Sequence, residues 1–276
     1  MDGQKNYCVR VVVLCVLLCQ AGCTAIFFQP MKGHILSPAD YGIDYRDEFF
    51  VSVDDLNLHG WWFPAKNSSR AVVIFLQGNS GNISTQATAA YWLTDHGYDV
   101  FIFDYRGYGI SEGVPTLEGA LSDTGQAILF AHRQAADKKI FVMGQSLGAS
   151  MGIPAVKAMK EHIDGAIFIS PFSDYREISR EFLSRSWLTW LFQWPLSFTI
   201  NNDYRPLDFV EEISPVPVLF LYSDADEIIP SAQIRALYEK ASRPKDIEVV
   251  VGSHNAIMGI QQNRDIIIRY LDAWVE

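Results

Sequence analysis

Short, continuous apolar runs recur along the chain and predict buried strands. The first run is residues 71–76, AVVIFL, and the others lie at 100–103, 140–143, 166–169, 216–222 and 247–251. Strands that are apolar at every position are typical of parallel sheets with both faces covered. Two earlier β-rich stretches, 41–53 and 57–63, flank Asp54 and Asp55 and predict an antiparallel hairpin.

Segments of helical length separate these runs. They lie at 83–96, 116–133, 147–160 and 231–241, and a last helix shows apolar positions at i, i+3, i+4 and i+7 from Ile267 to Trp274. Alternating strands and helices predict an α/β fold with a mostly parallel sheet and helices on both faces. One connection, rich in Trp and Phe, is too long for a single crossover helix. It predicts a small cap insertion over about 172–212, at the carboxyl edge where such sheets bind ligands.

Composition narrows the classes of function. The 276-residue chain is 49% apolar and 20% charged, which fits a folded domain with a small insertion and excludes disorder over most of its length. Its formal net charge is −10. An acidic protein lacks the basic surface that phosphate backbones require, so we expect no nucleic-acid partner. The composition leaves the oligomeric state open.

All four cysteines lie near the N-terminus, at Cys8, Cys15, Cys19 and Cys23. The body of the protein is therefore neither a disulfide scaffold nor a cysteine-ligated metal protein. The segment has a basic start, an apolar run over 11–19, and small residues before the last cysteine. This is the order of a secretory signal.

The end of this segment resembles a bacterial lipobox, whose cysteine is lipidated and becomes the mature N-terminus. Gln20 departs from that pattern, which prefers leucine three residues before the cysteine. An uncleaved anchor over 11–28 is the alternative. In either case we expect attachment to a cell-envelope membrane. Thr24 is not a retention aspartate, which favours the outer membrane if the source is a diderm bacterium.

These observations predict three parts. Residues 1–22 are a signal peptide or anchor with lipidation at Cys23, residues 23–44 are a linker, and residues 45–276 are the folded domain with its cap.

A nucleophile motif stands at one of the predicted strand-to-helix junctions. Residues 144–148, GQSLG, match the G-x-S-x-G elbow, which needs a strand before the serine and a helix after it. Ser146 meets both conditions. A second match, 109–113, is followed by Val114 and Pro115, which cannot start a helix. Ser146 is therefore the candidate nucleophile, and Ser111 is assigned to a loop.

A serine nucleophile needs a base, and the base needs an orienting acid. Asp226 follows the predicted strand at 216–222 and is the candidate acid, with Asp224 as the alternative. His254 follows the last predicted strand in a Gly-Ser loop and is the candidate base. For the remaining histidines, which precede the sheet's core, end helices or approach a strand, we expect surface or capping roles.

Two backbone N–H groups are expected to stabilise the oxyanion of a tetrahedral intermediate. Leu147 follows the nucleophile directly. Asn79 lies in the loop after the strand at 71–76, where Gly78 lets the backbone approach a substrate. The other histidines are not spaced along the sequence from another histidine or an acid as metal ligands usually are. We therefore expect no metal and no cofactor.

At these motifs the chain resembles α/β-hydrolases of the serine-aminopeptidase-like (hydrolase-4-like) branch, over about residues 45–276. The resemblance rests on LQGNSGN (76–82), DYRGYGISEG (104–113), GQSLG (144–148), DEIIP (226–230) and GSH (252–254). It implies an α/β-hydrolase fold with a Ser146–Asp226–His254 triad, and it makes Asp104 and Arg106 a pair that fixes a loop. The family usually has histidine where this chain has Gln77. Its members include acylglycerol lipases and protein depalmitoylases.

The cap segment is aromatic and nearly uncharged between 187 and 200. Trp187, Trp190 and Trp194 are candidates for packing onto the sheet, for an acyl-binding groove above Ser146, or for contact with lipid. The leading hypothesis is a membrane-tethered serine hydrolase that cleaves carboxylic, acyl or thio esters of small molecules or lipids. An aminopeptidase and a non-catalytic binding module of the envelope are the alternatives.

Overall fold

The computed structural model describes residues 26–276. The expected signal or anchor over 1–22 and the lipidation site Cys23 lie outside the described residues. Between 26 and 276, the chain has no helix that is both long and apolar enough to span a lipid bilayer.

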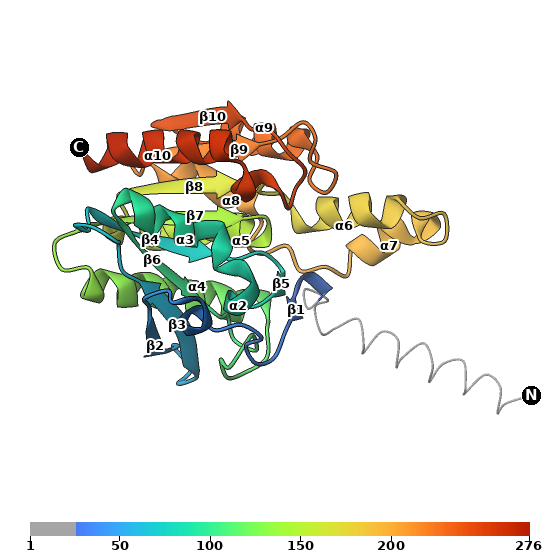
Figure 1. Ribbon diagram of the computed structural model, residues 1–276. Helices are drawn as coiled ribbons and strands as arrows, with labels where there is room; N and C mark the ends of the chain where they lie inside the picture. Colours follow the sequence, from blue (N-terminus) through green and yellow to red (C-terminus); the bar gives the residue numbers. More distant parts are fainter. Residues whose placement is uncertain (1–25) are drawn as a thin grey trace, which may run out of the picture.

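A single large sheet forms the centre of the molecule (Figure 1). Its strands are β2 (Arg46–Val51), β3 (Asn57–Phe63), β4 (Ala71–Leu76), β6 (Tyr98–Phe103), β7 (Lys139–Gln145), β8 (Gly165–Ile169), β9 (Val218–Tyr222) and β10 (Lys245–Val249). They are hydrogen-bonded in the order β10-β9-β8-β7-β4-β6-β3-β2. The β2–β3 and β3–β6 pairs are antiparallel and the other pairs are parallel. The predicted mostly parallel sheet, including its antiparallel hairpin, is confirmed.

Helices cover both faces of this sheet. They are α2 (Ile83–Gln86), α3 (Thr88–Tyr91), η3 (Trp92–His96), α4 (Leu117–Gln134), α5 (Leu147–Ala158), α9 (Ser231–Lys240) and α10 (Gln261–Val275), with short turns η2 (Pro38–Tyr41), η4 (Lys160–His162) and η7 (Ile257–Gly259). Helices α4, α5 and α9 pack into one core, and α3, η3 and α10 pack into the other.

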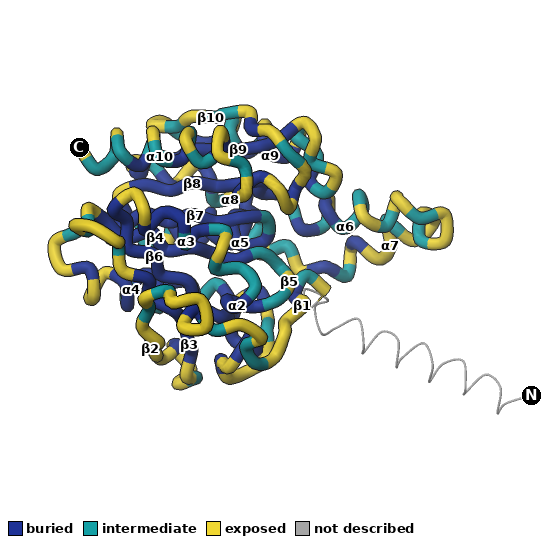
Figure 2. Tube along the Cα trace, in the orientation of Figure 1, coloured by how far each residue is buried: buried dark blue, intermediate teal, exposed yellow. Residues whose placement is uncertain are grey.

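The continuous apolar strands serve both cores. Along β4, Ile74 and Leu76 point into one core while Val73 and Phe75 point into the other, and all four are fully buried. Each such side chain contributes about 1.5–3 kcal/mol when it is removed from water. A strand between two helical layers therefore cannot carry the polar alternation of a half-exposed strand. Figure 2 shows the resulting buried centre.

Several elements differ in extent from the sequence expectation, and the last strand, expected over 247–251, is β10 (Lys245–Val249). The single helix expected over 83–96 is three short pieces, α2, α3 and η3, and ends at Gly97 with φ +83°. The strand expected from 216 begins in regular pairing at Val218, because Pro217 has no N–H to donate to a neighbouring strand.

The described part of the expected linker, residues 26–44, is packed on the domain. Phe28 is buried, β1 (Gln29–Pro30) pairs with β5 (Ser80–Gly81), and Lys32 bridges to Gly109. This part of the predicted linker therefore packs against the domain. The apolar and aromatic residues of this segment are too scattered for their spacing to predict a helix or strand. Contacts with the rest of the domain hold the segment in place.

The expected insertion over 172–212 divides into two parts. Helices α6 (Tyr175–Ser184), η5 (Trp190–Phe192) and α7 (Gln193–Ser197) project from the body beyond the edge of the sheet (Figure 1). The following α8 (Pro206–Phe209) and η6 (Val210–Ile213) return to pack against α5. We call the projecting part, residues 175–198, the cap.

Candidate active site

Ser146 lies at a sharp turn between β7 and α5. Its backbone has φ 55° and ψ −120°, a conformation that non-glycine residues rarely adopt. The turn is held by a hydrogen bond of 2.9 Å from the Ser146 N–H to the carbonyl of Ile169 on β8. Strain of this kind persists where the surroundings enforce it, and it is common at reactive residues.

The glycines of the motif are required by close packing. A Cβ on Gly148 would lie 2.2 Å from the carbonyl oxygen of Leu76, and a Cβ on Gly144 would lie 2.7 Å from the backbone of Ala149. Side chains at either position would push the helix away from the sheet. The sequence context therefore places the turn correctly, and the packing explains the residue types.

The second G-x-S-x-G match has a structural place. Ser111 is 2% exposed and lies in the loop after β6. Its hydroxyl donates to the carbonyl of Asp104 at 2.8 Å and accepts from the His59 N–H at 2.9 Å. Both functions of the hydroxyl are used inside the fold, so Ser111 has no access to a substrate.

His254 and Asp226 form a buried pair at the same edge of the sheet. The Nδ1 atom of His254 lies 2.8 Å from Oδ2 of Asp226, and the side chains are 5% and 1% exposed. The Ile228 and Ile229 N–H groups donate to Oδ1 of Asp226, each at 2.9 Å. Asp224 is exposed and makes no such bond in the described structure. The geometry therefore favours Asp226 over Asp224 as the orienting acid.

Sequence reasoning missed three groups that hold this pair. Ser170, directly after β8 and at φ 48°, donates its hydroxyl to Oδ2 of Asp226 at 2.7 Å. Gln145 donates to the carbonyl of His254 at 3.1 Å, and the Glu227 carboxylate accepts from the His254 N–H at 3.1 Å. A usable signal existed for Ser170, because it ends a buried strand at the edge that carries Ser146.

These contacts set the charge of Asp226. Burial raises the pKa of Asp226, but hydrogen bonds from the His254 ring, the Ile229 N–H and the Ser170 hydroxyl outweigh burial and hold that pKa below its ordinary value. The carboxylate is therefore ionised at neutral pH and available to stabilise a protonated imidazole.

This pKa shift predicts the acid sensitivity of the fold. Because the folded pKa of Asp226 lies below the unfolded value of about 3.9, its contribution to stability is complete above that value and is lost as the pH falls through the folded pKa. We expect urea unfolding between about pH 6 and pH 3 to show a shallower loss of stability for Asp226→Asn than for wild type. Parallel loss in the two proteins would contradict this assignment.

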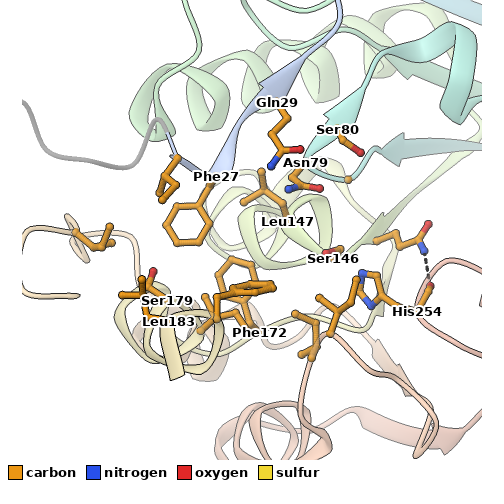
Figure 3. Close-up of a pocket in the computed structure, with 18 of the residues that line it drawn as sticks. Phe27, Gln29, Asn79, Ser80, Ser146, Leu147, Phe172, Ser179, Leu183 and His254 are labelled. Atoms are coloured by element: carbon orange, nitrogen blue, oxygen red, sulfur yellow. Dashed lines mark hydrogen bonds between the residues drawn. The ribbon is translucent and has the colours of Figure 1, made fainter. Parts of the chain in front are cut away.

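Ser146 and His254 both line one cavity of about 520 Å³, together with Leu147 and Asn79 (Figure 3). No hydrogen bond joins the Ser146 hydroxyl to the His254 ring within residues 26–276. Such bonds are often long without substrate and shorten in the reacting complex. The structure thus brings the four sequence candidates together around one space.

The expected oxyanion donors have suitable backbone positions. Leu147 is the first residue of α5, where N–H groups have no partner within the helix. The carbonyl of Asn79 accepts from the Gln29 N–H at 2.8 Å and from the Tyr108 hydroxyl at 2.6 Å, which fixes the loop. Gln77 donates to the Phe103 carbonyl and to Asp104, each at 3.3 Å, so its side chain anchors the same loop.

The cavity walls are mostly apolar. They come from the N-terminal segment, the cap and its flanking residues, and the loop after β9, and include Ile26, Phe27, Phe172, Ile178, Phe182, Leu183, Leu196, Ile200, Ile228 and Ile229. No aspartate or glutamate lines this space in the described chain.

Trp187, Trp190 and Trp194, the predicted substrate-contacting residues of the cap, are not among the residues that line the cavity. They are 83%, 54% and 57% exposed on the outside of the cap. The faces of α6 and α7 that look toward the cavity carry Phe182 and Leu196 instead. The tryptophans also do not pack onto the sheet, so the cap presents an exposed aromatic surface.

The Asp104–Arg106 pairing implied by the resemblance is also corrected. Arg106 binds Asp123 at 2.7 Å and Asp54 at 2.9 Å, while Asp104 binds His34 at 2.8 Å. Both residues fix loops, but with different partners. Within the described residues, His34, His59 and Asp104 form a group whose side chains could hold a metal ion.

The chain is similar to known proteins in sequence and in structure. The model of a family described as serine aminopeptidase, S33 (Hydrolase_4), matches residues 67–209. The uncharacterized protein YfhR of Salmonella typhi is 30% identical over 282 residues, covering 95% of this chain and 92% of that protein. An uncharacterized membrane protein of Saccharomyces cerevisiae is 28% identical, covering 82% of this chain and 79% of that protein.

A solved structure shares the fold. The esterase of Pyrococcus furiosus superposes with a TM-score of 0.73 at 20% identity, covering 91% of this chain and 98% of that chain. Together with the mostly parallel sheet, this similarity shows an α/β-hydrolase fold.

Proposed function

The chain belongs to the serine aminopeptidase S33 (Hydrolase_4) family, and from that premise we propose that it is a serine hydrolase that cleaves carboxylic esters through an acyl-Ser146 intermediate. The observation that carries the proposal is the buried His254–Asp226 pair beside the strained Ser146 turn, at one apolar cavity. Strained backbone of this kind persists only where the surrounding structure enforces it, and it clusters at functional sites.

The proposed reaction uses groups that line the cavity. The Ser146 hydroxyl attacks the ester carbonyl while the Nε2 atom of His254 takes its proton. The Asp226 carboxylate stabilises the resulting imidazolium through its 2.8 Å contact with Nδ1. The N–H groups of Leu147 and Asn79 stabilise the oxyanion. His254 then protonates the leaving alcohol or thiol, and a water molecule that it activates hydrolyses the acyl-serine.

The walls of the cavity favour acyl esters or thioesters as substrates. Apolar side chains from the cap and N-terminal segment would cover an acyl chain next to Ser146. The family description favours an aminopeptidase as the second candidate. A peptidase of that kind needs a negative group for the substrate's α-ammonium, and the described cavity lining contains none.

Activity-based labelling tests this proposal. We expect a fluorophosphonate probe to modify the protein at Ser146, as mapped by peptide mass spectrometry, and p-nitrophenyl acyl esters of increasing chain length to be hydrolysed with a burst. Aminoacyl anilides should be poor substrates. Efficient anilide cleavage would select the peptidase, and absence of both adduct and burst would select a non-catalytic binding module.

Ser170 is proposed to position Asp226, since its hydroxyl reaches Oδ2 at 2.7 Å. We expect Ser170→Ala to lower kcat by about tenfold, the value of one hydrogen bond to a charged group, while KM and Tm change little. Ser173→Ala is the matched control, because that buried serine bonds Gln233 instead. An equal fall in kcat for both variants would contradict a positioning role.

We also propose attachment to a membrane. The cap carries many exposed large apolar residues, namely Trp187, Leu188, Trp190, Leu191, Phe192, Trp194, Leu196 and Phe198. Ile26, the first described residue, lines the same cavity as Leu196 of the cap. A tether formed by the preceding apolar segment would therefore leave the domain on the cap's side.

Fractionation and mass spectrometry of the mature N-terminus test this attachment. A lipidated Cys23 at the N-terminus supports the lipoprotein, and Cys23→Ser should then accumulate the precursor. An intact N-terminus with unchanged membrane recovery of Cys23→Ser supports the anchor. Recovery of wild type in the soluble fraction would contradict both.

A further inference from the structure

Three side chains from distant parts of the sequence lie close together next to Gln77. His34 comes from the N-terminal segment, His59 from β3, and Asp104 is the residue directly after β6. One ligand atom from each lies within 4.8 Å of the other two, and Nε2 of His34 is 2.8 Å from Oδ2 of Asp104. The two imidazole rings lie 5.1 Å apart between centroids. The three residues are far apart in the sequence, so their spacing does not predict that they form a group.

His59 has an unused ring nitrogen in the interior. The residue is 1% exposed, and its Nε2 atom lies 2.8 Å from Oδ1 of Asp47. Its Nδ1 atom is buried and has no hydrogen-bond partner among residues 26–276. A buried polar atom without a partner is costly and calls for an explanation such as a bound ion. Nδ1 is the nitrogen that the contact with Asp47 leaves free to bind one.

The surrounding contacts orient the three groups as they do at metal sites. A histidine ligand commonly donates its other ring N–H to a carboxylate, as His59 does to Asp47. The far oxygen of Asp104, Oδ1, accepts from the Ile83 N–H at 2.9 Å and from Gln77 at 3.3 Å. These bonds fix the carboxylate so that Oδ2 faces His34.

We propose that His34, His59 and Asp104 bind a divalent first-row transition ion, for which Zn²⁺ is the best match. Two imidazole nitrogens and one carboxylate oxygen are a common donor set for Zn²⁺, with a water molecule as fourth ligand. Tetrahedral bonds of that length separate the ligand atoms by about 3.3 Å. Since all three atoms lie within 4.8 Å, no pair has to change by more than about 1.5 Å.

The backbone closes the site on one side. A Cβ on Gly109 would lie 1.8 Å from Oδ2 of Asp104 and 2.7 Å from Nε2 of His34, and Gly109 has φ +48°. A side chain there would occupy the space between the ligands. Gly109, the first glycine of the second G-x-S-x-G match, therefore has a structural role at this site that is independent of catalysis.

An ion here would join the N-terminal segment to the catalytic domain. His34 belongs to the same segment as Phe27, which lines the cavity, and Asp104 anchors Gln77, which precedes Gly78 and Asn79. Binding to the folded protein alone stabilises it by mass action. We therefore expect Zn²⁺ to raise Tm as well as to bind.

The test uses the full chain and Zn²⁺ alone, and its readouts do not depend on ester hydrolysis. All four cysteines lie in residues 1–23 and would bind Zn²⁺ themselves, so they are alkylated with iodoacetamide first. Isothermal titration of the chelator-treated protein should then show one equivalent of Zn²⁺ bound, with a rise in Tm. Co²⁺ in the same site should give a visible d–d absorption band.

His34→Gln decides the proposal. Its side chain is 17% exposed, and glutamine keeps a donor for Asp104, so the fold should persist. We expect it to weaken Zn²⁺ binding at least tenfold, and His59→Gln to do the same if it folds. His96→Gln is the control, since His96 is an exposed histidine whose ring packs against Trp92 at 5.9 Å and which is not one of the three grouped residues. No saturable binding by wild type, or equal binding by His34→Gln, would overturn the site.

Discussion

Replacing Ser146 by alanine is expected to lower kcat/KM for activated esters by about 10⁴-fold or more and to abolish the fluorophosphonate adduct. Without the Oγ atom no acyl-enzyme forms, and the oxyanion donors and binding cavity leave only residual catalysis. The substitution should leave the turn unchanged, because the turn is held by the hydrogen bond from the residue 146 N–H to the Ile169 carbonyl and by the close packing of the flanking glycines. Far-UV circular dichroism and Tm should therefore match wild type.

Ser111→Ala is the matched control, because it removes the serine of the other G-x-S-x-G sequence. Its hydroxyl serves the backbone of Asp104 and His59, so we expect some loss of stability but full labelling of the folded protein. Labelling of Ser146→Ala at another residue, with hydrolysis preserved, would remove Ser146 from the role proposed for it.

Replacing Asp226 by asparagine should produce the second largest effect, a fall in kcat of about 10³–10⁴-fold. The Asp226 carboxylate receives the Nδ1–H of His254 at 2.8 Å and has a lowered pKa. An amide turned with its NH₂ toward His254 would favour the wrong tautomer, and in either orientation it lacks the charge that stabilises the imidazolium. KM should change much less than kcat, since Asp226 does not line the cavity.

The neighbouring acid provides a close control for this experiment. Asp224 is exposed and two residues away, so Asp224→Asn should keep kcat and its pH profile. Steady-state kinetics between about pH 5 and pH 9 would compare the two variants. A larger loss in Asp224→Asn than in Asp226→Asn would reverse the assignment of the orienting acid.

The strands were predictable because burial on two faces imposes a simple pattern. A short run such as AVVIFL, rich in β-branched residues, is typical of a strand buried on both faces, and β4 covers the same six residues. The helix expected over 83–96 is divided into α2, α3 and η3, although Ala87 and Trp92 at the junctions keep right-handed helical dihedral angles. Helical length between two strands does not show whether the hydrogen bonds run without interruption.

The cap and the N-terminal segment show features that composition and local sequence pattern do not predict. Trp187, Trp190 and Trp194 were candidates for packing onto the sheet, for an acyl-binding groove or for contact with lipid, and all three are exposed. Composition says that a segment is apolar without saying which side meets solvent, because short helices carry too few turns to fix a face. The segment around Phe28 is held by pairing between β1 and β5, which no local pattern announces.

The sequence by itself determined the layered α/β architecture, the turn at Ser146 and the acid and base candidates, because each depends on residues adjacent in the chain. Tertiary structure decided which side chains meet. The strand order brings Ser170 to Asp226, and the packing of residues 26–44 brings His34 to His59 and Asp104. Such contacts join groups tens of residues apart, so they depend on how whole elements pack, which the local alternation of apolar and polar residues does not encode.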